Sequence, residues 1–240
     1  MTYCLGILSK EGVAGLADTR ITSGSETTTA KKIYAAQGKQ QAYFIMTSGL
    51  RSVRDKAITY FEEEMDSLDE PYHKLYQVVN MFGSKLRQVA SEDRSSLEKS
   101  GLQLNLYSIV GGQLPDDAHP RLYLLYPQGN WIEVSDNTPY VIIGNTGFGN
   151  PVLRRSLHYD LPLAAGLRAG FLSFDATRIS ACDVGYPLDV IMLRKDTYRL
   201  TEHRFREQEL RSISTFWNER LKEAVHNLPT TVLDEIAQKC

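Results

Sequence analysis

The first twenty residues, MTYCLGILSKEGVAGLADTR (1–20), contain two short apolar runs on either side of a polar turn. The runs are TYCLGIL (2–8) and VAGLAD (13–18), and the turn between them is SKEG (9–12). Short apolar runs around a tight turn with glycine predict a β-hairpin. Facing residues of such a hairpin have numbers that sum to about 20 or 21, depending on the loop type.

This pairing places three polar side chains at one end of the hairpin. Position 2 faces position 18 or 19, so Thr2, Asp18 and Arg20 come together. A less specific interpretation is also open, because threonine is common in strands. Asp18 and Arg20 can equally form a solvent-exposed pair, which contributes about 0–1 kcal/mol.

A threonine directly after the initiator methionine can become both a nucleophile and a general base. Removal of Met1 would make Thr2 the N-terminus and place its hydroxyl beside its own α-amine. That amine has an ordinary pKa of about 7.7–8.0, which suits a general base at neutral pH. A nearby cation, from Lys31 or Lys32 at the start of the next predicted strand, would favour the unprotonated amine. An aspartate beside that lysine would hold it ionised.

The rest of the chain alternates groups of strands with pairs of helices. Periodicity predicts strands at 31–37, 41–48, 102–111, 121–127, 131–135, 140–144, 187–195 and 198–205, and helices near 50–68, 72–98, 149–158, 163–178 and 209–228. The polar stretch TSGSETTTA (22–30) is predicted to be a loop, and the tail after Pro229 to be weakly ordered. Hairpins dominate and regular βαβ alternation is missing. This pattern favours antiparallel sheets with helical layers outside them, in one domain over 1–240.

Bulk composition argues against several classes of partner. The chain has 27 basic and 29 acidic residues, so we expect neither a nucleic-acid nor a membrane partner. It has no apolar run near the roughly 20 residues that span a bilayer, and its start lacks the features of a signal peptide. Three cysteines suit a reducing cytoplasm. The five histidines and three cysteines show no metal-ligand spacing, so we expect no metal and no cofactor.

Four motifs together resemble the amino-terminal half of proteasome β-type subunits. They are Thr2, LADTR (16–20), KKI (31–33) and TSG (47–49). The expected absence of a propeptide before Thr2, together with SFDAT and VGYPLDV (173–177 and 184–190), is most similar to Anbu, the bacterial proteasome-like "ancestral β subunit" family.

The resemblance implies an N-terminal-nucleophile (Ntn) hydrolase fold of the α+β class, a four-layer αββα sandwich with two antiparallel sheets between helical layers. It implies that Thr2 is the nucleophile and Asp18 the carboxylate that orients the lysine. Arg20 matches the arginine of the family motif that LADTR (16–20) resembles, and Lys32 matches the lysine that tunes the pKa of the amine. Gly49 matches the glycine whose backbone N–H stabilises an oxyanion, and glycine allows close approach of a substrate.

Two segments depart from the family pattern. In GNTGFG (144–149), Asn145 stands where a serine is usual. In SACDVG (180–185), Ser180 or Asp183 could assist, in an uncertain register. The first segment also suggests a phosphate loop, but it lacks the Lys-[ST] of a P-loop and the βαβ setting.

Three functions are therefore expected from the sequence. The first is a self-compartmentalising threonine hydrolase that cleaves peptide or other amide bonds. The second is an oligomeric scaffold or binding module of the same fold with little turnover. The third is the processing of a special small amide substrate. The resemblance implies a homo-oligomer, either a ring or an open helical assembly.

Overall fold

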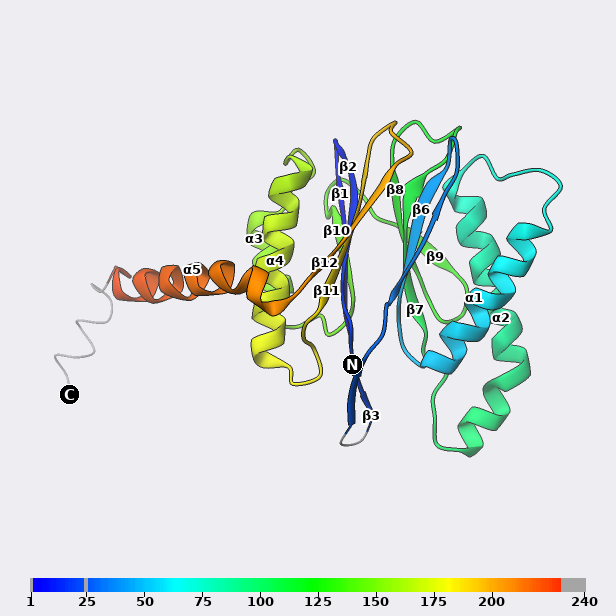
Figure 1. Cartoon of the computed structure of the whole chain (residues 1–240), viewed down its shortest axis with the longest axis horizontal. Helices are drawn as coiled ribbons and strands as arrows, with labels where there is room; N and C mark the ends of the chain where they lie inside the picture. Colours follow the sequence, from blue (N-terminus) through cyan, green and yellow to red (C-terminus); the bar gives the residue numbers. More distant parts are fainter. Residues whose placement is uncertain (1, 24–25, 230–240) are drawn as a thin grey trace.

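Two antiparallel five-stranded sheets lie face to face between two helical layers in the computed structural model, which describes residues 2–23 and 26–229 (Figure 1). The first sheet consists, in spatial order, of β10 (Tyr140–Gly144), β1 (Tyr3–Ser9), β2 (Gly12–Asp18), β11 (Leu188–Arg194) and β12 (Leu200–Phe205). The second consists of β5 (Ile33–Gln37), β6 (Ala42–Ser48), β7 (Tyr107–Gln113), β8 (Arg121–Leu125) and β9 (Trp131–Glu133).

Helices cover the outer face of each sheet and produce the predicted αββα order (Figure 1). Helices α1 (Arg51–Asp66) and α2 (Leu75–Lys99) pack on the second sheet, and α3 (Asn150–Ser156) and α4 (Leu163–Ser180) pack on the first. Helix α5 (Glu207–His226) begins against α4 and then projects away from the body (Figure 1).

The apolar core forms three layers, one for each interface of the sandwich. The layer between the two sheets includes Phe44, Met46 and Ile191. The outer layers include Phe61 of α1 on one side and Phe174 of α4 on the other. Both faces of the inner strands are therefore covered, which explains why β1 and β2 are buried at every residue and read as continuous apolar runs.

The predicted first hairpin is confirmed, and the structure fixes its register. Cys4 pairs with Ala17, so facing residue numbers sum to 21. The turn contains only Lys10 and Glu11. This register places Asp18 opposite Tyr3, the residue that follows Thr2. The hairpin therefore brings the start of the chain to the carboxylate, as the pairing predicts.

Two predicted segments were wrong in detail. Residues 22–30 were predicted to be a loop, but β3 (Arg20–Ser23) and β4 (Glu26–Thr29) pair with each other as a separate hairpin beyond the sheets (Figure 1). Threonine favours strands, and this propensity outweighed the turn signals. Residues 102–106 were predicted to belong to a strand, but β7 begins at Tyr107. Its neighbour β6 ends opposite, at Ser48, so the earlier residues have no strand to pair with.

Candidate active site

A buried ion pair lies at the end of the first hairpin. The Lys32 Nζ is 2.6 Å from the Asp18 Oδ1, and their side chains are 6% and 0% exposed. Lys32 also donates a 2.8 Å hydrogen bond to the Arg20 carbonyl. Asp18 comes from the last position of β2 and Lys32 immediately precedes β5, so the pair joins the two sheets.

The same carboxylate oxygen also holds the start of β1. The Tyr3 backbone N–H donates to the Asp18 Oδ1 at 2.9 Å. Burial raises the pKa of the Asp18 carboxyl, while the Lys32 ammonium and the Tyr3 N–H oppose that rise. A charge-assisted bond in a site of low dielectric keeps the lysine ammonium at a defined position.

The peptide group that follows Thr2 is held at both edges. Its N–H is the Tyr3 donor to Asp18, and its carbonyl accepts a 2.7 Å hydrogen bond from the Asn145 N–H. Gly144 permits this contact, because a Cβ at that residue would lie 2.0 Å from the Thr2 carbonyl oxygen. Gly144 also has a φ of +88°, which favours glycine. The two bonds fix the plane from which the Thr2 α-carbon extends.

A cavity of about 830 Å³ opens at this point of the molecule. Thr2, Lys32, Gly49 and Arg20 line it together. Gly49 has a φ of +145°, and a Cβ there would lie 2.4 Å from the Asn105 carbonyl oxygen. Only glycine fits this turn between β6 and α1 without displacing the neighbouring chain.

Arg20 ties the cavity to the segment between α4 and β11. Its Nη1 donates a 2.8 Å hydrogen bond to the Cys182 carbonyl, and its guanidinium packs against Gly185. Asp183 lies in the loop between those two contacts. The Ser180 hydroxyl instead donates to the Ala176 carbonyl at 3.0 Å, on its own helix.

The eight predicted site residues therefore fall into three groups. Thr2, Arg20, Lys32 and Gly49 line the cavity, and Asp18 lies behind it on Lys32. Asn145 acts on Thr2 through its backbone. Ser180 and Asp183 belong to the adjacent segment and are not among the described residues that line the cavity.

The prediction missed the Tyr3 backbone N–H and two arginines of the cavity wall, Arg51 and Arg54. The hairpin register contained the signal for the first, because Tyr3 faces Asp18. No sequence signal places Arg51 and Arg54 in the wall of the cavity that Thr2 lines, because their position depends on how α1 packs.

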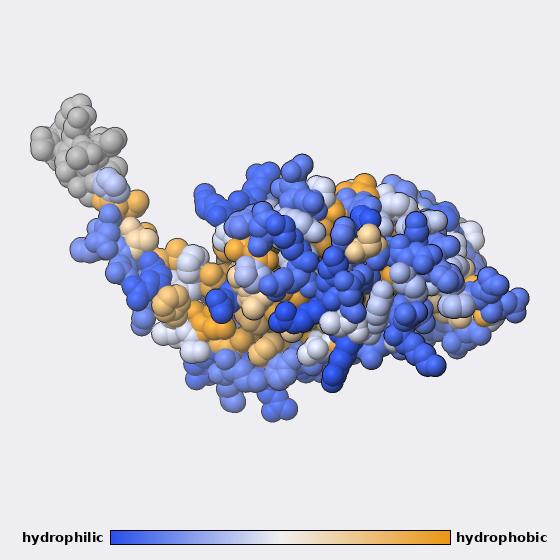
Figure 2. Space-filling model, turned by 90° about the horizontal axis from the view of Figure 1, so that it is seen from above, coloured by the Kyte–Doolittle hydropathy of each residue, from blue (hydrophilic) through white to orange (hydrophobic). Residues whose placement is uncertain are grey.

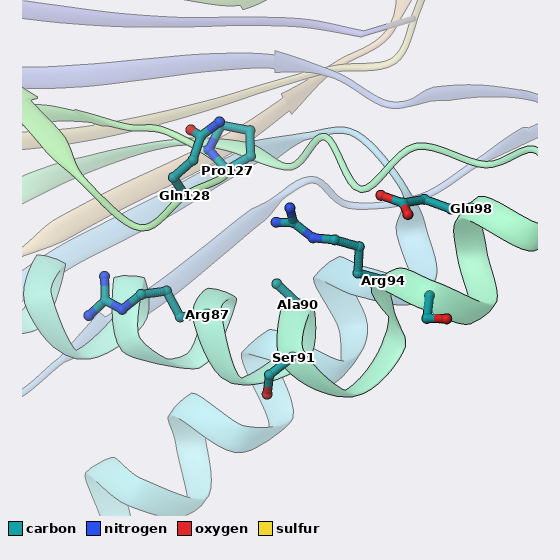
Figure 3. Close-up of a pocket in the computed structure, with 8 residues that line it drawn as sticks. Arg87, Ala90, Ser91, Arg94, Glu98, Pro127 and Gln128 are labelled. Carbon is teal, nitrogen blue, oxygen red and sulfur yellow. The ribbon is translucent and has the colours of Figure 1, made fainter.

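A second depression, of about 540 Å³, lies on α2 beside the turn between β8 and β9 (Figure 3). Arg87 and Arg94 line it, and it contains none of the predicted site residues. Within residues 2–23 and 26–229, no group of three or more His, Cys, Asp or Glu side chains is arranged to hold a metal ion. None of the helices in these residues is both long and apolar enough to span a bilayer.

The layer order and the position of the first strand beside the cavity define an Ntn-type sandwich. Comparison with known families places the chain more closely. The profile described as "Proteasome subunit" matches residues 2–170, and the chain belongs to this family.

Solved structures of Anbu proteins are similar over most of the chain. An Anbu (Gly-1) mutant from Hyphomicrobium sp. strain MC1 is 27% identical with a TM-score of 0.88, over 95% of this chain and 98% of that one. Anbu (ancestral beta-subunit) from Yersinia bercovieri is 26% identical with a TM-score of 0.87, over 95% and 98%. The structure described as the helical assembly of the Anbu complex from Pseudomonas aeruginosa is 26% identical with a TM-score of 0.87, over 95% of this chain and 97% of that one. No curated protein sequence matches the chain.

Proposed function

We propose that the protein is an N-terminal threonine hydrolase that cleaves peptide or other amide bonds. The observation that supports this most strongly is the buried Lys32–Asp18 pair, because its lysine lines the same cavity as Thr2. The nucleophile forms when Met1, which lies outside the described residues, is removed.

In this mechanism each residue has one task. The freed α-amine accepts the proton of the Thr2 hydroxyl, and the oxygen attacks the substrate carbonyl. The Lys32 ammonium disfavours a second positive charge nearby and so keeps the amine unprotonated. The Gly49 N–H stabilises the oxyanion. The amine then protonates the leaving nitrogen, and water hydrolyses the resulting ester.

The bonds around Thr2 support the proposal through geometry. The Tyr3 N–H and the Thr2 carbonyl are both engaged, so the α-carbon that carries both reacting groups has little freedom. Orientation of this kind lowers the entropic part of a barrier. Asn145 supplies one of these bonds from its backbone, and its side-chain identity is less constrained for that reason.

The test begins with the intact mass of the protein and an electrophilic probe specific for an N-terminal threonine. Protein without Met1 should be labelled once, at Thr2. Thr2→Ala should abolish labelling and Thr2→Ser should retain it, with the fold of both variants confirmed by circular dichroism. Unlabelled protein that demonstrably lacks Met1 would refute the proposal.

A second candidate function, an assembled scaffold, is favoured by the surface of α5. Phe216, Leu221, Val225 and Leu228 on or just after this helix are 56%, 44%, 69% and 54% exposed. Figure 2 shows hydrophobic residues along the projecting segment and at its junction with the body. Exposed apolar stripes of this kind mark protein interfaces. One structural relative is described as a helical assembly. We therefore propose a homo-oligomer.

A charge placed on α5 tests the assembly, and Thr2→Ala then separates the two functions. Leu221→Glu should reduce the mass of the assembly in light scattering, whereas the matched Asn218→Glu on an exposed polar position should not. If Thr2→Ala leaves both assembly and cellular phenotype unchanged, the scaffold is favoured. Loss of phenotype with the assembly intact favours the hydrolase.

A further inference from the structure

The cavity beside Thr2 has a strongly one-sided charge. Among the described residues that line it, every charged side chain is basic: Arg20, Lys32, Arg51 and Arg54. The whole chain has a net charge of −2, so this accumulation is local and does not reflect composition. Clefts lined by charge of one sign concentrate ligands of the opposite sign.

The existing ion pairs do not neutralise the wall formed by α1. Asp18 pairs with Lys32, whereas Asp55 is the one carboxylate of the described residues that pairs with the two arginines of α1. The Arg51 Nε is 3.3 Å from the Asp55 Oδ2, and the Arg54 Nε is 2.8 Å from the Asp55 Oδ1. Two guanidinium groups thus share one carboxylate, and one positive charge remains.

The start of α1 adds to this positive field. Leu50, at the N-cap, makes no side-chain capping bond, and the first turn contains no acidic residue. The N-terminus of a helix carries a partial positive charge from its backbone N–H groups. This end of α1 follows Gly49 directly, so the charge lies next to the proposed oxyanion site.

We propose that the enzyme prefers substrates whose acyl part carries a carboxylate, that is, peptides or amides cleaved after an acidic residue. This inference rests on the proposed function. The negative group would lie in the main cavity near Arg51 and Arg54. An adjoining pocket of about 330 Å³ is less suitable for it, because Asp55 lines that pocket.

Paired probes test this preference. Two peptide electrophiles that differ only in Glu or Gln beside the reactive group are compared by their labelling rates at Thr2. We expect the Glu probe to react about three- to fivefold faster, because an exposed guanidinium contributes only a modest energy. Its advantage should fall with added salt, since exposed charges are screened.

Matched variants locate the preference on α1. Arg51→Gln should reduce the rate advantage of the Glu probe over the Gln probe to near one. The control is Arg94→Gln, an exposed arginine of α2 on the separate depression (Figure 3), which should change neither rate. Equal rates for both probes in the wild type would overturn the acidic preference while leaving the threonine hydrolase intact.

A binding measurement keeps the inference testable without turnover. The Thr2→Ala variant is titrated with peptides that end in Glu amide or in Gln amide, and binding is measured by calorimetry. Tighter binding of the Glu peptide, lost in Thr2→Ala/Arg51→Gln, supports the cationic site. Equal binding overturns it. Absence of probe labelling in protein that lacks Met1 would instead refute the proposed hydrolase, and the substrate preference with it.

Discussion

Replacing Lys32 with methionine is the sharpest test of the buried ion pair. The substitution keeps most of the side-chain volume but removes the partner of a carboxylate that is 0% exposed. Breaking a buried pair from one side costs about 3–5 kcal/mol. Asp18 can limit the loss by taking up a proton, which at pH 7 costs about 4 kcal/mol from an ordinary pKa near 3.9. We therefore expect the free energy of unfolding to fall by about 3–4 kcal/mol.

The neighbouring lysine provides a matched control. The Lys31 Nζ bonds the Glu202 Oε2 at 2.6 Å, but these side chains are 49% and 41% exposed. A surface pair contributes about 0–1 kcal/mol, so Lys31→Met should be nearly neutral. For a chain of this length, the midpoint of thermal unfolding should fall by about 6–16 °C in Lys32→Met and by less than about 4 °C in Lys31→Met. The thermal midpoints of the two variants and the wild type are compared by calorimetry at one protein concentration.

The pH dependence of the Lys32→Met deficit has a definite sign. Loss of the ammonium raises the folded-state pKa of Asp18 beyond the rise that burial already causes. Ionisation of a buried carboxyl without a partner destabilises the folded state. The free energy of unfolding therefore falls as pH rises from the pKa of Asp18 in the unfolded state to its higher pKa in the folded state. The gap between Lys32→Met and wild type should therefore narrow as pH falls from 7 towards 4.

Two results would refute this reasoning. One is an equal loss of stability in Lys31→Met and Lys32→Met. The other is a deficit of Lys32→Met that stays constant between pH 7 and pH 4.5. The double variant Asp18→Asn/Lys32→Met should be more stable than Lys32→Met alone, because no uncompensated charge remains buried.

Four further substitutions, one of them a control, test the packing around the site and the core. Gly49→Ala should lower the free energy of unfolding by more than about 1 kcal/mol in denaturant titrations, because of its φ of +145° and the nearby carbonyl. Gly147→Ala, which has open space around it, should have little effect. Phe61→Ala should cost about 3–5 kcal/mol in the same assay, since this ring is fully buried between three other aromatic rings. Tyr3→Phe should cost about 1–2 kcal/mol, because it removes a buried 2.8 Å hydrogen bond to Ser173, and an unchanged stability would contradict that contact.

Local sequence patterns predicted much of the fold. The hairpin of β1 and β2 follows from two apolar runs around a short turn, and its register brings Asp18 to Tyr3. Turn signals were less reliable than strand propensity in residues 22–30, because Arg20–Ser23 and Glu26–Thr29 pair as the β3–β4 hairpin. The predicted start of β7 was wrong because this strand extends only as far as β6 lies beside it.

The site divides in the same way between local and long-range causes. Motifs identified Thr2, Asp18, Lys32 and Gly49 as candidates, and all four lie in or directly behind one cavity. The contribution of Asn145 differs from what its side chain suggests, because the contact is made by its backbone N–H.

Sequence patterns alone predict the first hairpin, the order of the helices and of the strands in the two large sheets, and the residues of the proposed chemistry. These features depend on side-chain periodicity and on turns, which act over a few neighbouring residues. Tertiary packing places Arg51 and Arg54 in the wall of the cavity that Thr2 also lines, and joins Arg20 to the segment before β11. Those contacts join residues far apart in the chain, and they exist because sheets and helices must stack to bury their apolar faces.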